Sequence, residues 1–149
     1  MNVYIIYDSL SGNTKRVADL IKATLETTNL SDLTIIMCNL NVSDYKIPHL
    51  TDEDYVFIGD WTCDYGNATE AVLAFIDMNE CLLLNNKHVF AFGTGETQWG
   101  EEHFCGAVDI IRNELGITHE GLKIEQYPAS DEQELEIREW TLSTLKEIN

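Results

Sequence analysis

The sequence is short of positive charge. Its 149 residues hold 9 lysines and arginines against 26 aspartates and glutamates, so the formal net charge is −17. Such a surface repels the phosphates of nucleic acids and anionic membranes and favours partners with positively charged faces. The same excess also serves solubility alone. We therefore expect no nucleic-acid or membrane ligand, and the charge by itself indicates no particular function.

Cysteine patterns for metal binding and long apolar runs are also missing. The four cysteines, Cys38, Cys63, Cys81 and Cys105, form no C-x-x-C pair and have no histidine grouped with them. This spacing argues against a zinc or iron–sulfur site, and we expect no metal. The sequence shows no signal-peptide pattern, and no apolar stretch approaches transmembrane length. We expect a cytoplasmic protein with reduced thiols.

Proline is scarce as well, with only Pro48 and Pro128, both near expected element boundaries. No linker, repeat or low-complexity tract interrupts the chain, which predicts one domain over residues 1–149. A domain of this size buries roughly 70% of the surface that its unfolded chain would expose, enough for a sizeable core.

Short apolar runs alternate with segments of helical periodicity. Buried strands are predicted over residues 3–7, 33–38, 55–59, 88–92 and 122–125. Apolar residues repeat at helical spacing within residues 17–25, 71–76, 104–115 and 135–145. Alternation of this kind predicts an α/β fold with a parallel sheet and helices on both faces. Residues 39–54 are the least regular, and we expect them to be mostly loop.

Ligands of open α/β sheets bind beyond the carboxyl ends of the strands, so the loops there matter most. The first strand is followed by Ser9-Leu10-Ser11-Gly12-Asn13-Thr14 and a helix that starts near Lys15. Backbone N–H groups, the helix dipole and three hydroxyls would hold a phosphate there without a cation. Simple N-capping by serine or asparagine is the alternative. The loop has neither the Walker A pattern nor G-x-G-x-x-G, which leaves one terminal phosphate monoester as the expected ligand group.

The loops after the third and fourth strands are rich in glycine, acidic and aromatic residues. They read Gly59-Asp60-Trp61-Thr62-Cys63-Asp64-Tyr65-Gly66-Asn67 and Gly93-Thr94-Gly95-Glu96-Thr97-Gln98-Trp99-Gly100. Aromatic side chains exposed at strand ends are costly unless they cover something, and two such loops would sandwich a flat ring. Any one of the three aromatic residues could instead be structural filler.

Taken together, these motifs resemble those of the flavodoxin family. The first loop resembles the family's phosphate loop, (T/S)-x-(T/S)-G-x-T. The later segments Gly93 to Trp99 and Phe104 to Asp109 resemble G-x-G-D-x-x-Y and F-C-x-A-V-D, and Gly121 to Glu125 resembles the last strand. The likeness runs nearly the full length and lacks the long inserted loop of some members, as in the short-chain class. It implies a flavodoxin-like three-layer sandwich whose five-stranded parallel sheet has the order 2-1-3-4-5.

The resemblance also implies a function. Flavodoxins are low-potential one-electron carriers whose non-covalently bound FMN shuttles between oxidised, semiquinone and hydroquinone states. They are not enzymes; they pass electrons between reductases and electron-accepting enzymes. For this chain we expect redox partner proteins with basic docking faces and a monomeric state. A backbone carbonyl within residues 63–66 would turn toward the flavin N5 once that nitrogen is protonated.

Carried over by position, the first loop would hold the phosphate and Trp99 would stack on the outer flavin face in place of the usual tyrosine. Glu96 stands where the family usually has aspartate. The inner-face residue stays open between Trp61 and Tyr65, because Cys63 is too small to cover the ring alone. The expected FMN-binding residues are Ser9, Leu10, Ser11, Gly12, Asn13, Thr14, Asp60, Trp61, Thr62, Cys63, Asp64, Tyr65, Gly66, Gly93, Thr94, Gly95, Glu96, Thr97, Trp99, Phe104 and Cys105.

Two other interpretations compete with this one. The flavodoxin-like activator of ribonucleotide reductase also binds FMN, but the acidity and the last strand of this chain argue against it. A signalling receiver domain would use Asp60 as its phosphorylated aspartate and Thr94 as its partner. Against a receiver, only Asp8 could serve as the metal-binding acid after the first strand, and Lys123 lies early in the fifth strand.

Overall fold

The structure is a computed structural model of the chain that describes residues 1–42 and 49–146. Its strands form one parallel sheet in the order β2-β1-β3-β4-β5, which confirms the expected topology. The strands are β1 (Asn2–Tyr7), β2 (Thr34–Asn39), β3 (Tyr55–Trp61), β4 (Val89–Gly95) and β5 (Leu122–Glu125).

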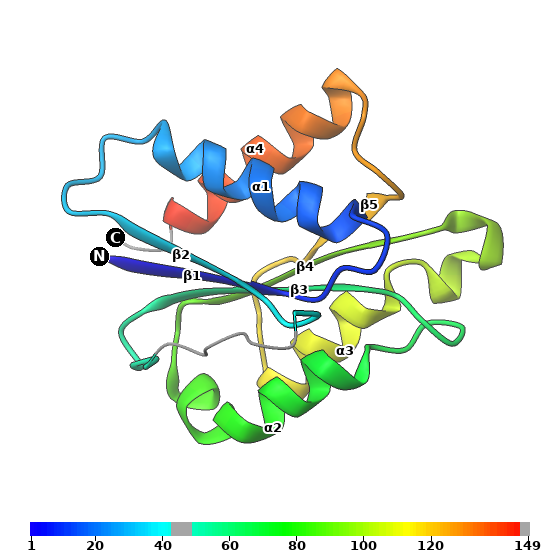
Figure 1. The fold of residues 1–149 in the computed structure, drawn as a ribbon, viewed down its shortest axis with the longest axis horizontal. Helices are drawn as coiled ribbons and strands as arrows, with labels where there is room; N and C mark the ends of the chain where they lie inside the picture. Colours follow the sequence, from blue (N-terminus) through cyan, green and yellow to red (C-terminus); the bar gives the residue numbers. More distant parts are fainter. Residues whose placement is uncertain (43–48, 147–149) are drawn as a thin grey trace.

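Helices cover both faces of this sheet. α1 (Asn13–Glu26) and α4 (Asp131–Lys146) lie on one face, and α2 (Glu70–Asn85) and α3 (Gly106–Leu115) lie on the other, as Figure 1 shows. Two short 3₁₀ turns, Thr97–Trp99 and Glu101–His103, precede α3. The chain is therefore a three-layer α/β sandwich.

Two apolar cores hold the layers together. The alternation of side chains along β1 divides them: Ile5 joins the core under α1 and α4, and Ile6 joins the core under α2 and α3. Both side chains are fully buried. Strands covered on both faces have to be apolar throughout, which explains why they are continuous hydrophobic runs in the sequence.

β3 and β4 extend further than their apolar runs predict. Their pairing continues through Asp60↔Gly93 and Trp61↔Thr94, so these residues belong to strands and not to loops. The loop expected over residues 39–54 begins after Asn39, the last residue of β2; its residues 43–48 lie outside the described part of the chain.

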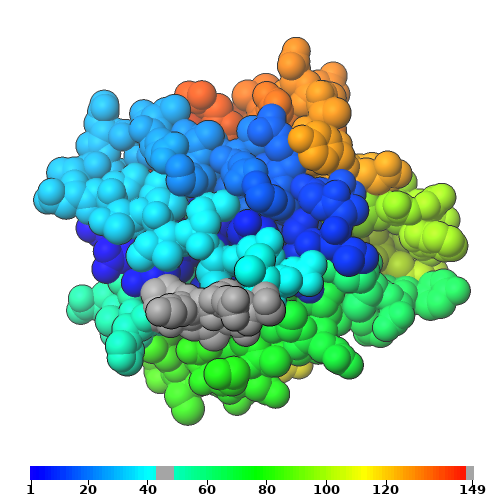
Figure 2. Space-filling view, viewed as in Figure 1, coloured from blue at the N-terminus to red at the C-terminus, as the bar shows by residue number. Residues whose placement is uncertain are grey.

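The carboxyl ends of β1, β3 and β4 meet at one end of the molecule, at the right in Figure 1, away from both termini. In the space-filling view, the loop after β1, the loop after β3 and the turns after β4 gather on this end (Figure 2). Within residues 1–42 and 49–146, no helix is long and apolar enough to cross a membrane.

Candidate functional site

A cavity of about 570 Å³ opens where these three strands end. Its walls are Leu10, Ser11, Asn13, Trp61, Thr62, Cys63, Asp64, Tyr65, Gly66, Thr94, Gly95, Glu96, Trp99 and His103. The sequence analysis had singled out every one of these residues except His103. The structure thus brings segments far apart in the sequence together at the topological switch point, where ligands of such sheets bind.

The loop after β1 leads directly into α1. The N-cap residue of the helix is Gly12, whose φ of 95° is left-handed, so neither serine nor asparagine occupies the N-cap position itself. Ser9 contributes in another way: its Oγ accepts the Lys15 N–H at 3.1 Å. Thr14 is fully buried, and its Oγ1 lies 2.9 Å from the Oγ1 of Thr94 on β4. These bonds fix the hydroxyl-lined loop at a helix N-terminus with no acidic side chain in its first turn.

The loop after β3 contains a strained turn. Asp64, Tyr65 and Gly66 have φ values of 42°, 57° and 106°, all left-handed. The turn is closed by the Gly66 N–H, which donates to the Cys63 carbonyl at 3.1 Å. The Asn67 side chain also donates to the Asp64 carbonyl at 3.1 Å. Left-handed non-glycine residues cost of order 1–3 kcal/mol each and tend to cluster at functional sites, and here they form one wall of the cavity.

This loop packs closely against the start of α3. A Cβ added to Gly106 would lie 2.3 Å from the carbonyl oxygen of Gly66, so only glycine fits at this contact. The preceding residue, Cys105, is buried with a φ of 50°. Burial raises the pKa of the Cys105 thiol to about 12, which keeps it neutral. Phe104 and Cys105 were both expected to contact the cofactor, but neither is among the cavity walls.

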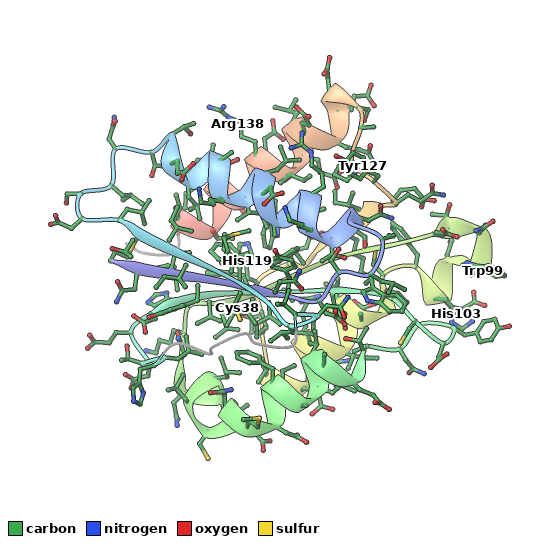
Figure 3. All side chains as sticks on the ribbon, in the orientation of Figure 1. Cys38, Trp99, His103, His119, Tyr127 and Arg138 are labelled. Carbon is green, nitrogen blue, oxygen red and sulfur yellow. The ribbon has the colours of Figure 1, made fainter. Side chains whose placement is uncertain are left out.

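Exposed aromatic side chains stand at the cavity mouth. Tyr65 is 77% exposed and Trp99 is 59% exposed, and their ring centroids lie 6.4 Å apart in an edge-to-face arrangement. Trp99 and His103 lie together at this end of the molecule in Figure 3. The indole N–H of Trp99 donates to Glu96 at 3.1 Å. Large exposed rings of this kind mark a binding surface more often than a folding requirement.

Trp61 differs from these two residues. Its side chain is partly buried, and its indole nitrogen is buried without a hydrogen-bond partner among the described residues. Buried donors are nearly always satisfied, so an orphaned one in a cavity wall fits a ligand that supplies an acceptor.

Asp60 does not line the cavity, contrary to the expectation that it contacts a ligand. It is fully buried, and its carboxylate accepts the N–H and the hydroxyl of Thr69. Burial, with a smaller contribution from the charge of Asp8, raises the pKa of Asp60 to about 7. An inaccessible carboxyl group also does not fit the phosphorylated aspartate of a receiver domain. Five further expected residues are not among the cavity walls: Ser9, Gly12, Thr14, Gly93 and Thr97.

The rim of the cavity is acidic. Asp64, Glu96, Glu101 and Glu102 lie on or beside its walls. No lysine or arginine is among the wall residues, and the one ionisable base there is His103, whose Nε2 lies 3.8 Å from Glu102. Among the described residues, no group of three or more histidine, cysteine, aspartate or glutamate side chains could hold a metal ion.

His103 was missed because a single histidine after two glutamates carries no motif of its own. Its position immediately before Phe104-Cys105 was the available signal, since that pair was already assigned to the site. The Nδ1 atom of His103 would lie 3.2 Å from a Cβ added to Gly66, so the imidazole packs directly on the loop after β3.

Comparison with known proteins identifies the relatives of this fold. The family described as "Flavodoxin domain" matches residues 4–122. A curated Bacillus subtilis (strain 168) protein, "Probable flavodoxin 1", is 34% identical over 133 residues, which cover 86% of this chain and 80% of that protein. Oxidised Flavodoxin 2 from Bacillus cereus superposes with a TM-score of 0.79 at 27% identity, covering 99% of both chains. A Fusobacterium nucleatum flavodoxin bound to flavin mononucleotide superposes with a TM-score of 0.67 at 16% identity, covering 98% of both chains.

Proposed function

Because the chain belongs to the flavodoxin family, we propose that it carries electrons one at a time on a non-covalently bound FMN. One observation carries this proposal. The same cavity is lined by the loop that leads into the N-terminus of α1, where a phosphate could bind, and by two loops that carry exposed aromatic rings. The orphaned indole nitrogen of Trp61 in the same cavity further supports a ligand there. FMN supplies the redox chemistry when bound, and the protein tunes it by stacking, hydrogen bonding and charge.

The loop after β1 would hold the phosphate. Backbone N–H groups at the start of α1 and the positive end of its dipole favour an anion. The Ser9 hydroxyl accepts the Lys15 N–H and keeps its own hydrogen to donate. Ser11 and Asn13 already line the cavity. The phosphate is therefore bound without a basic side chain, which keeps the site compatible with an acidic surface.

The aromatic loops would hold the ring system. We assign Trp99 to the outer face of the flavin, because it is large, exposed and fixed by its bond to Glu96. Trp61, the last residue of β3, and Tyr65, in the loop after it, are the candidates for the opposite face, since both line the cavity. The strained turn at Asp64 and Tyr65 would present backbone groups to the ring edge.

An electron carrier needs an accessible cofactor edge and a surface on which redox partner proteins dock. The acidic rim of the cavity would attract redox proteins with basic docking faces, and salt would weaken the attraction because exposed charges are screened. We propose that the protein works as a cytoplasmic monomer that exchanges electrons with such reductases and acceptors and transforms no substrate of its own.

A redox titration tests this proposal. The FMN complex, titrated under argon with a reductant of known potential and followed by absorbance, is expected to show two separate one-electron steps. A single two-electron step would overturn the one-electron assignment.

A further inference from the structure

Asp60 places a buried carboxylate behind the cavity wall. The side chain is fully buried near the end of β3. Its Oδ2 accepts the Thr69 N–H at 2.7 Å, and its Oδ1 accepts the Thr69 hydroxyl at 2.9 Å. Burying a charge is unfavourable unless it is paired or hydrogen-bonded. Here both carboxylate oxygens of Asp60 accept hydrogen bonds from the same residue, Thr69, which lies nine positions later in the chain.

Thr69 is itself an anchor point. It is the N-cap of α2, and its Oγ1 accepts the Val72 N–H at 3.4 Å. The Asp60–Thr69 contact therefore ties the end of a central strand to the beginning of a helix. Residues 61–68 lie between the two, and six of them form cavity walls: Trp61, Thr62, Cys63, Asp64, Tyr65 and Gly66.

The segment between Asp60 and Thr69 needs contacts that hold its conformation. Its turn holds three successive left-handed residues, and a strained conformation persists only where its surroundings fix it. The Cys63–Asn67 backbone bonds fix the tip, with N···O distances of 2.9 and 2.7 Å, but they do not fix the tip relative to the sheet. The Asp60–Thr69 contact ties the two ends of this segment to each other, in addition to the packing of Gly66 against Gly106.

We propose that Asp60 is a positioning residue, which holds residues 61–68, the end of β3 and the loop after it, in their cofactor-binding shape through its paired hydrogen bonds to Thr69. The inference rests on the proposed FMN site, and it assigns a role to a residue that does not touch the cofactor. The loop faces the ring system, whereas the phosphate is held by the loop after β1. Loosening residues 61–68 is therefore expected to weaken the binding of FMN and of riboflavin by the same factor.

The chain offers graded variants for the test. Asp60→Leu removes both acceptors and keeps the branching at Cγ, and Thr69→Val removes the hydroxyl. Asp60→Asn keeps both contacts, because its amide oxygen accepts the Thr69 N–H while its amide nitrogen donates to the hydroxyl. Thr69→Ser keeps the hydroxyl.

Asp54 provides the matched control. It is also a buried carboxylate, and its Oδ2 accepts the Thr51 N–H at 2.7 Å. It lies immediately before β3, at the opposite edge of the sheet from the cavity. Asp54→Leu is expected to lower the free energy of unfolding without changing ligand affinity.

Dissociation constants of FMN and riboflavin, measured by fluorescence titration of each folded apoprotein, decide the question. Asp60→Leu and Thr69→Val are expected to weaken both ligands about tenfold or more, the value of one hydrogen bond to a charged group. Asp60→Asn and Thr69→Ser are expected to stay within about threefold of the wild type, well below that hydrogen-bond value. Unchanged affinity in Asp60→Leu, or equal loss in Asp54→Leu, overturns the inference. Failure of the wild type to bind either flavin overturns the proposed function instead.

Discussion

At the residue scale, Thr14 is predicted to take part in phosphate binding. Its buried hydroxyl bridges the loop after β1 to Thr94 on β4. We predict that Thr14→Val weakens FMN by roughly ten- to a hundredfold, the effect of losing one hydrogen bond to a charged group. Riboflavin, which has no phosphate, should lose much less. Titrating both flavins into the apoprotein measures the difference, and equal losses would contradict the phosphate assignment.

Trp99 is the residue expected to shape the redox behaviour. Its indole should stack on the oxidised ring and exclude water, and it offers no counter-charge to the fully reduced, anionic flavin. Trp99→Ala should therefore weaken oxidised FMN about tenfold and raise the midpoint potential of the second one-electron step. Spectroelectrochemistry at fixed pH and salt measures this potential.

Tyr65→Ala and Trp61→Ala, measured alongside, identify the residue on the opposite flavin face. If either variant changes affinity and potential while Trp99→Ala changes neither, Trp99 does not cover the outer face.

Asp60 should make the stability of the apoprotein depend on pH. Burial, then the charge of Asp8, raises its pKa from 3.8 to about 7, against the hydrogen bonds from Thr69. The folded state thus binds this proton more tightly than the unfolded chain does. The stabilisation is complete below pH 4 and is lost as the pH rises through about 7. Urea unfolding from pH 4 to 8 should show this loss in the wild type and a flatter profile in Asp60→Asn; equal profiles would contradict it.

At the scale of the elements, the contact between the loop after β3 and α3 is a packing constraint that the prediction from sequence did not include. Gly106 begins α3 directly against Gly66. Gly106→Ala should destabilise the protein by about 1–3 kcal/mol, as expected for overpacking. Asn113→Ala, an exposed change in the same helix, is the control. Urea unfolding of both variants measures the cost, and a Gly106→Ala variant as stable as the wild type would show that the loop moves aside freely.

Most of the helices and strands could be predicted from sequence patterns, but some of their ends could not. The strands, the helix positions and the three loops around the cavity followed from apolar runs, helical periodicity and motifs, because buried parallel strands have characteristic residue patterns. The strand order was implied by the resemblance to flavodoxins. The ends of β3 and β4 did not, since glycine and aspartate are poor strand formers and only pairing with a neighbour extends these strands. The left-handed backbone conformations of Tyr65 and Cys105 could not be predicted from the sequence either, because tertiary contacts impose such conformations on residues that rarely adopt them.

The same limit applies within the site. Asp60 was placed in the cavity because it follows the apolar part of a strand, but it points into the protein and bonds to Thr69. A strand alternates its side chains between two faces, so a shift of one residue decides between cavity and interior. His103 carried no motif, and only the fold brings it to the loop after β3.

At the scale of the whole molecule, the acidic surface charge has to be compatible with an anionic cofactor. The chain has a net charge of −17, and in the proposed site the loop after β1 would hold the anionic phosphate with neutral donors. In the same proposal, the acidic rim of the cavity would attract positively charged partner proteins. This arrangement explains how a strongly acidic chain would carry an acidic cofactor.

The absorption spectrum of the purified protein tests the central claim most directly. We expect flavin bands in the blue and near-ultraviolet, and acid should release one equivalent of FMN, identified by chromatography against FMN, FAD and riboflavin standards. Apoprotein given FMN should regain the same spectrum. A colourless protein whose apo form leaves the spectrum and fluorescence of added FMN unchanged would contradict the account.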